Sequence, residues 1–227
     1  MKVLLAEDDV HTRNGLQELL QAEGYDTLTA TDGAQALQLF QDVQPDFVLL
    51  DIMMPHRDGY EVCREIRRHA PEVPIIFISA KAEEIDRVIG LELGADDFIM
   101  KPFGTREVIA RIRAVARRCL SRQPSVSAIS LRFGDLAIFP KELRARRGEQ
   151  IIDLSLRDVK ILTLLHARQG EVVDRDTLFD QCWGRDYLPN SRTLDQHVAK
   201  LRRRIERDPR HPELIRTVHG VGYRYDG

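Results

Sequence analysis

The chain has 227 residues, of which 43% are hydrophobic and 31% charged, which is enough for one large or two modest domains. It has no long apolar run and no basic-then-apolar leader, so we expect neither a membrane span nor a secretory signal, and a cytoplasmic location. The three cysteines lie far apart and lack metal-ligand spacing, which argues against a disulfide framework or a zinc site.

The net charge of −2 is unevenly distributed along the chain. Residues 1–118 carry 14 Lys and Arg against 21 Asp and Glu, a net charge of −7, whereas residues 130–227 carry 19 against 15, a net charge of +4. Between them, a stretch rich in Ser, Pro and Gln interrupts the periodic pattern. We therefore predict an acidic domain (1–118), a linker (119–129) and a basic domain (130–227).

The acidic half alternates short apolar runs with amphipathic stretches. Strands are predicted at 2–6, 26–30, 46–51, 74–80 and 97–101, and helices at 10–24, 33–43, 59–70, 82–95 and 104–119. Such alternation favours right-handed crossovers and a five-stranded, doubly wound parallel sheet of the α/β class. In these sheets the ligand site lies beyond the carboxyl ends of the strands.

Polar residues follow the strands at that predicted edge. Glu7 and Asp8 follow the first strand, and the third, fourth and fifth end at Asp51, Ser79 and Lys101. Clustered carboxylates need a cation, and oxygen ligands without His or Cys favour Mg²⁺. Asp51 is then a candidate nucleophile for a phosphoryl group, which Mg²⁺ and Lys101 would neutralise and the Ser79 hydroxyl would contact. An acidic triplet alone more often marks the start of a helix, so the joint placement carries this prediction.

Residues 1–118 resemble the receiver domain of bacterial two-component response regulators, which has a flavodoxin-like fold. The resemblance implies that Asp51 is the phosphoacceptor and that Glu7, Asp8, Asp51 and the Met53 carbonyl hold Mg²⁺. It also makes Ser79 and Phe98 the switch residues, where Thr and Tyr are commoner in the family. In the OmpR/PhoB subfamily, which these positions resemble, a homodimer forms on phosphorylation through pairs that correspond to Arg87–Glu107, Asp97–Arg111 and Asp96–Arg118.

The basic half begins with alternating short runs between 131 and 155 that predict an antiparallel sheet. Helices are predicted at 155–170, which opens with a Ser155-x-x-Asp158 capping pattern, at 174–184 and at 191–208. On the last of these, an apolar stripe (Leu194, Val198, Leu201, Ile205) opposes a mainly cationic face (Arg192, Gln196, Lys200, Arg203, Arg207), with Thr193 and Arg204 on its flanks.

A charged helix face is usually just solvated, but here a second helix precedes it and a Gly-turned hairpin follows at 213–227. This arrangement predicts a winged helix-turn-helix that binds double-stranded DNA. Residues 130–227 resemble the winged-helix domain of the OmpR/PhoB family. The resemblance implies groove contacts from Arg192, Gln196, Lys200 and Arg203, phosphate contacts from Thr193, Arg204 and Thr217, and a wing at residues 220–224 that includes Gly220, Tyr223 and Arg224. The loop 184–191 is a candidate contact for RNA polymerase.

The combined hypothesis is a transcription regulator, not an enzyme, that receives a phosphoryl group from a sensor histidine kinase and then binds promoter DNA as a dimer. Two alternatives fit the sequence less well. A phosphatase of the haloacid dehalogenase type would need an acid two residues after the nucleophile, where Met53 stands. An incomplete acidic site would favour a DNA-binding protein whose receiver serves only as a dimer scaffold, but this site is complete.

Overall fold

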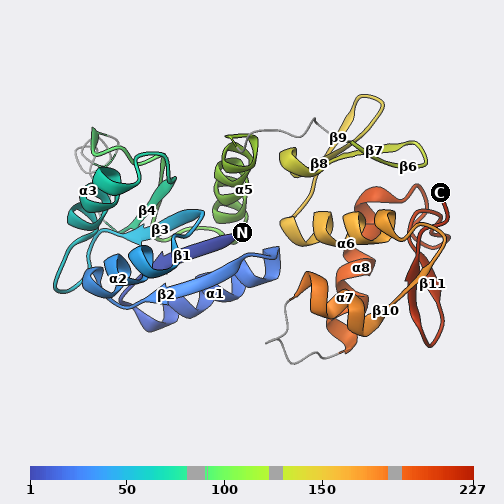
Figure 1. The fold of residues 1–227 in the computed structure, drawn as a ribbon, viewed down its shortest axis with the longest axis horizontal. Helices are drawn as coiled ribbons and strands as arrows, with labels where there is room; N and C mark the ends of the chain where they lie inside the picture. The colour runs from blue at the N-terminus through green and yellow to red at the C-terminus, as the bar shows by residue number, and fades with distance from the viewer. Residues whose placement is uncertain (81–89, 91, 123–129, 184–190) are drawn as a thin grey trace. The chain divides into compact units, whose positions relative to one another are not determined.

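The computed structural model describes residues 1–80, 90, 92–122, 130–183 and 191–227. The chain divides into two compact units, Met1–Gln123 and Pro124–Gly227 (Figure 1). Each unit has a hydrophobic core of its own. Among the described residues, no helix is long and apolar enough to cross a membrane.

The first unit is a five-stranded parallel sheet with helices on both faces. Its strands are β1 (Lys2–Ala6), β2 (Asp26–Ala30), β3 (Phe47–Asp51), β4 (Ile75–Ser79) and β5 (Asp97–Met100), in the order β2-β1-β3-β4-β5. The helices are α1 (Val10–Glu23), α2 (Gly33–Val43), α3 (Gly59–His69) and α5 (Thr105–Arg122). The predicted doubly wound α/β sheet is thus confirmed, and its strands match the predicted ones to within one or two residues.

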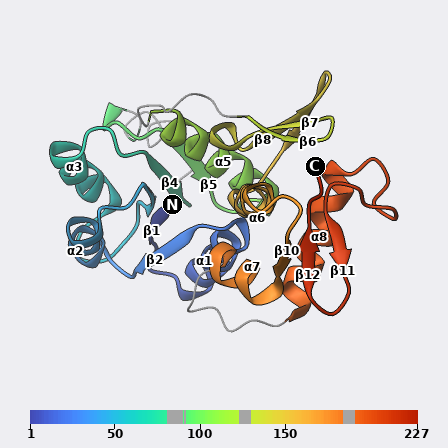
Figure 2. The same cartoon turned by 45° about the vertical axis from the view of Figure 1, so that its right-hand side comes forward.

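The layers of this unit follow from its apolar runs. Every residue of β3 and β4 is buried, as expected for strands covered on both faces. Helices α2 and α3 pack side by side on one face, and α1 and α5 lie together on the other (Figures 1 and 2). Most of the predicted helix 82–95, including Arg87, lies outside the described residues.

Helix α5 continues past the predicted domain boundary at 118. It runs to Arg122, so the first four residues of the predicted linker 119–129 are helical, and the division between the units falls at Gln123. The sequence is consistent with this extent, because residues 119–122 include neither glycine nor proline. Polar residues alone do not end a helix.

The second unit combines two antiparallel sheets with three helices. One sheet contains β6 (Leu131–Phe133), β7 (Leu136–Phe139), β8 (Arg144–Arg147) and β9 (Gln150–Asp153), and the other has the order β10-β12-β11. The strands of the second sheet are β10 (Val172–Asp174), β11 (Arg216–Val218) and β12 (Gly222–Arg224). The helices are α6 (Leu156–Ala167), α7 (Arg175–Cys182) and α8 (Ser191–Ile205).

This second unit is the predicted winged helix-turn-helix. Ser155 and Asp158 form the expected capping box at the start of α6. The predicted apolar stripe of α8 is fully buried at Leu194, Val198, Leu201 and Ile205. Strands β11 and β12 pair as an antiparallel hairpin, with Gly220 in its turn at a φ of 76°, a left-handed conformation that suits glycine (Figure 2).

Candidate functional site

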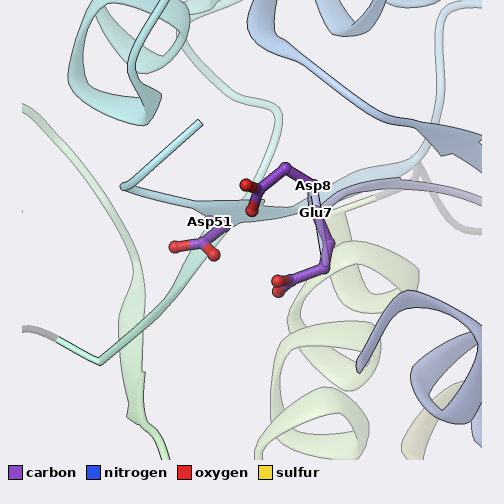
Figure 3. A group of neighbouring side chains, drawn as sticks. All are labelled: Glu7, Asp8 and Asp51. Atoms are coloured by element: carbon purple, nitrogen blue, oxygen red, sulfur yellow. The ribbon is translucent and has the colours of Figure 1, made fainter. Parts of the chain in front are cut away.

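The carboxylates predicted for the first unit meet at the carboxyl edge of its sheet. Glu7 and Asp8 follow β1 and Asp51 ends β3, and because β1 and β3 are neighbours their side chains lie together (Figure 3). One oxygen from each of the three lies within 4.8 Å of the other two. Glu7 and Asp51 are buried, whereas Asp8 is exposed at the mouth of the group.

Lys101 connects two of these acids from the end of β5. Its Nζ donates to Glu7 Oε1 and to Asp51 Oδ2, both at 2.7 Å. Burial opposes the charged form of Lys101, but the hydrogen bonds to Asp51 and Glu7 outweigh it and raise the pKa of the lysine. Lys101 therefore stays cationic in the site, where it neutralises part of the negative charge.

Glu7 is the acid with the most perturbed environment. Its burial, reinforced by the charge of Asp51 and opposed by Lys101, raises the pKa of Glu7 to about 7. Its second oxygen, Oε2, is buried and has no hydrogen-bond partner in the described part of the chain. A buried carboxylate oxygen without a donor is a free ligand position for a cation.

These donors fit Mg²⁺. The group offers only oxygen atoms, one of them the partnerless Glu7 Oε2, and the exposed side of Asp8 leaves room for the water molecules that Mg²⁺ retains. The three carboxylates outnumber the single ammonium of Lys101, so a divalent cation would balance the charge. The residues present are therefore able to hold this ion.

The backbone around the acids is held by contacts that the sequence did not indicate. The Arg13 guanidinium donates to the carbonyl oxygens of Glu7 and Asp8, at 2.7 and 3.0 Å. The amide of Met53 donates to Asp51 Oδ1 at 3.0 Å. Gly59, the first residue of α3, lies so close that an added Cβ would be 2.2 Å from the main-chain oxygen of Asp51.

Ser79 is the last residue of β4, and Phe98 lies within β5. Ser79 is fully buried, and Phe98 is 8% exposed with its ring centroid 6.4 Å from that of Phe77. The structure thus places both predicted switch residues inside the unit. The Ser79 hydroxyl is at the same strand edge as Asp51, whose neighbour in the sheet register is Ile78.

The acids and bases predicted for a dimer interface pair within the single chain. Arg111 contacts Asp97 at 2.8 Å and Glu107 at 3.0 Å, and Arg118 lies 3.9 Å from Asp96. Half of the Arg118 side chain remains exposed. These pairs place charged groups of α5 beside Asp97 of β5 and beside Asp96, which also pairs with Arg67 at 3.1 Å.

In the second unit, α8 presents part of the predicted cationic face. Gln196, Lys200 and Arg203 are exposed, and Thr193 is half-buried. The side chain of Arg192 and the whole loop 184–190 lie outside the described residues. Thr217 on β11 accepts a hydrogen bond from Arg202 at 2.8 Å, and Arg207, beyond the end of α8, pairs with Asp135 at 2.6 Å.

Two of the predicted DNA contacts, Arg204 and Tyr223, have polar partners within the second unit. The Arg204 guanidinium is bonded to the fully buried carboxylate of Asp158, at 2.8 and 2.9 Å, because a buried charge needs an opposite partner. Tyr223 is only 3% exposed, since alternation along β12 turns its side chain into the unit. The Tyr223 side chain is thus turned away from solvent, whereas 34% of the Arg204 side chain remains exposed.

The buried Asp158 also receives a hydrogen bond from His197 Nε2 at 2.9 Å. Burial alone would raise the pKa of Asp158, but the bond from His197 and the charge of Arg204 prevail and hold that pKa well below its usual value. The capping pattern located Asp158 in the sequence, but not its contact with α8, which depends on tertiary packing.

Comparison with known proteins agrees with both units. Residues 3–113 match the family described as response regulator receiver domain, and residues 148–225 match the family described as transcriptional regulatory protein, C terminal. A receiver followed by such a domain defines a DNA-binding response regulator.

Solved structures also include proteins similar to this chain. DrrB of Thermotoga maritima, an OmpR/PhoB homologue, is 30% identical, and the match covers 100% of this chain and 99% of DrrB, with a TM-score of 0.45. The receiver domain of Francisella response regulator 1452 is 33% identical over 52% of this chain and 97% of its own, with a TM-score of 0.50. The HemR receiver domain of Leptospira biflexa is 32% identical over 50% and 92%, with a TM-score of 0.48. Because of its two family matches and its 30% sequence identity to DrrB over the full chain, the chain belongs to the OmpR/PhoB family of two-component response regulators.

Proposed function

We propose that this response regulator accepts a phosphoryl group on Asp51 from a sensor histidine kinase and in that form dimerises and binds promoter DNA to control transcription in the cytoplasm. The observation that carries the proposal is the bridge from Lys101 to both Glu7 and Asp51 at the mouth of an oxygen-only acidic group. The protein acts as phosphoacceptor and transcription regulator, not as an enzyme on small molecules.

In the transfer, an Asp51 carboxylate oxygen attacks phosphorus. The P–O bond to Asp51 forms as the bond from phosphorus to the donor breaks, and the donor leaves with that electron pair. Mg²⁺, held by Glu7, Asp8, Asp51 and the Met53 carbonyl, would neutralise negative charge on the phosphoryl oxygens. Lys101 supplies a second positive charge through its ammonium group, which is already 2.7 Å from Asp51.

We propose that Ser79 donates its hydroxyl to the phosphorylated Asp51 and that Phe98 follows it, so that phosphorylation favours one of two arrangements of β4 and β5. The surface on β5 and α5 would then pair with its copy in a homodimer, with Arg87, Asp96, Asp97, Glu107, Arg111 and Arg118 as the interface. Support comes from the ion pairs that bring the described members of this set together between α5 and the start of β5.

The proposed DNA interface consists of α8 and the hairpin. Arg192, Gln196, Lys200 and Arg203 are proposed groove contacts, Thr193, Arg204 and Thr217 phosphate contacts, and Gly220, Tyr223 and Arg224 parts of the wing. The exposure of Gln196, Lys200 and Arg203 on one helix supports this assignment. The loop 184–191 is proposed to contact RNA polymerase.

The test compares wild type with Asp51→Asn and with Asp42→Asn, an exposed acid on α2 that serves as the matched control. Each protein is incubated with acetyl phosphate in the presence and absence of Mg²⁺. Intact mass measures phosphorylation, light scattering measures oligomeric state, and selection from a random DNA library measures sequence recognition. We expect a phosphorylated, dimeric, site-selective form only for wild type and Asp42→Asn with Mg²⁺. Equal DNA selection by all three proteins under all conditions would instead support a receiver that acts only as a scaffold.

A further inference from the structure

Tyr223 lies at a junction between the hairpin and α8. It is 3% exposed on β12, opposite Thr217 on β11. Its hydroxyl donates to Asp195 Oδ1 at 2.6 Å, and Asp195 is on α8 directly before Gln196. This hydrogen bond therefore joins the hairpin to the helix that carries the proposed groove contacts.

Asp195 is an unexpected residue on this helix. About half of its side chain is exposed (49%), and a carboxylate beside groups that face DNA would repel the phosphates. Two partners account for it, the Tyr223 hydroxyl at 2.6 Å and the Arg175 guanidinium at 3.4 Å. The carboxylate thus has two structural contacts within the unit.

Two arginine side chains from α7 and α8 lie over the Tyr223 ring. The guanidinium of Arg175, the first residue of α7, lies 5.5 Å from the ring centroid, and that of Arg202 on α8 lies 5.4 Å from it. Arg202 also donates to the Ile215 carbonyl oxygen at 2.9 Å and to the Thr217 hydroxyl at 2.8 Å. Contacts around this one tyrosine thus link both helices of the helix-turn-helix to both strands of the hairpin.

We propose that the hydrogen bond from Tyr223 to Asp195 positions the hairpin against α8 and thereby determines how strongly the protein prefers its own DNA site, without either residue touching DNA. The bond is short and one partner is charged, which makes it stronger than a neutral one. Burial, together with Asp195, raises the pKa of Tyr223 to about 12, so the phenol remains a donor at neutral pH.

The inference rests on the proposed DNA binding, and the test uses the full chain treated with acetyl phosphate and Mg²⁺. Wild type first enriches a duplex from a random library, and the ratio of its affinities for that duplex and for a scrambled one is then measured. The variants are Tyr223→Phe, Asp195→Ala and the double variant.

We expect each single substitution to lower the ratio about 10-fold, in line with the loss of one hydrogen bond to a charged group. The double variant should be no worse than either single variant, because both changes remove the same bond. Tyr223→Phe should leave affinity for the scrambled duplex unchanged, whereas Asp195→Ala should increase it, since a negative charge is lost near the phosphates.

Tyr225→Phe is the matched control. Tyr225 is equally buried at 3% exposure, and its hydroxyl donates to the Arg132 carbonyl oxygen at 3.0 Å, away from α8. Its removal should lower thermal stability to a similar degree but keep the ratio. Asp195 lies at a half-exposed position, so Asp195→Ala remains informative even if a tyrosine variant fails to fold.

Three results with the variants would overturn the inference. If Asp195→Ala lowers the ratio and Tyr223→Phe does not, the aspartate itself recognises DNA. If the two losses add in the double variant, the residues act separately. If Tyr225→Phe lowers the ratio as much, general destabilisation explains the effect. A wild type that enriches no sequence would contradict the proposed DNA recognition itself, and the inference with it.

Discussion

Replacing Asp158 by Asn should destabilise the second unit by about 3 kcal/mol. The carboxylate is fully buried and bonded to both Arg204 and His197. Breaking a buried ion pair costs roughly 3–5 kcal/mol, and the lower end applies here because about a third of the Arg204 side chain (34%) still reaches solvent. Asn keeps the shape of the side chain but removes the charge that both partners need.

The destabilisation caused by Asp158→Asn should decrease as the pH falls. Because the folded-state pKa of Asp158 is depressed, its stabilising contribution is fully present above the unfolded pKa of about 4 and is lost as the pH falls through the folded value. The difference in unfolding free energy between wild type and Asp158→Asn should therefore be largest at neutral pH and shrink in strong acid.

The assay is urea unfolding followed by tryptophan fluorescence. The chain has a single tryptophan, Trp183, whose ring lies 5.5 Å from that of His197, so the signal reports on this unit. Asp153→Asn is the control, since that side chain is 57% exposed and pairs with Arg144 at the surface, where a pair contributes less than about 1 kcal/mol. Equal effects of the two substitutions, or a difference that grows as the pH falls, would refute the reasoning.

Three further outcomes are expected. Gly59→Ala should lower the unfolding free energy of the first unit by about 1–3 kcal/mol, because the new Cβ would lie 2.2 Å from the main-chain oxygen of Asp51. Gly104→Ala is the control, since nothing lies within 4 Å of that position, and equal unfolding free energies for the two variants would argue against the close contact. Burial raises the pKa of Cys63 to about 11 and of Cys182 to about 12, so iodoacetamide at pH 8 should alkylate both thiols only after the chain unfolds. Mass spectrometry detects the alkylation, and rapid labelling of the folded chain would contradict the burial of the two cysteines. Arg111→Ala should weaken the phosphorylated dimer several-fold in sedimentation experiments while phosphorylation proceeds normally, and an unchanged dimer would remove Arg111 from the interface.

The strands and the acidic site could be predicted because their signals are local. An apolar run that ends on Asp51 is both a strand and a site, and the edge rule for parallel sheets brings it beside Glu7 without further information. The buried stripe of α8 was likewise readable from its spacing. In each case the period of the sequence matches the period of the element.

Contacts between residues distant in the sequence could not be predicted in the same way. Arg204 bonds to Asp158, 46 residues away, and Tyr223 bonds to Asp195, 28 residues away, and no local pattern indicates either contact. The composition shift at 119 likewise does not mark the end of α5, because the helix continues to Arg122.

The close approach of Gly59 to Asp51 has a mechanical consequence. Helix α3 begins against the main chain of Asp51, and the Gly59 amide donates to the Ile52 carbonyl oxygen at 2.9 Å. The main chain of Asp51 therefore cannot move toward α3 without a steric clash. Any displacement of this strand end has to be directed away from the start of α3.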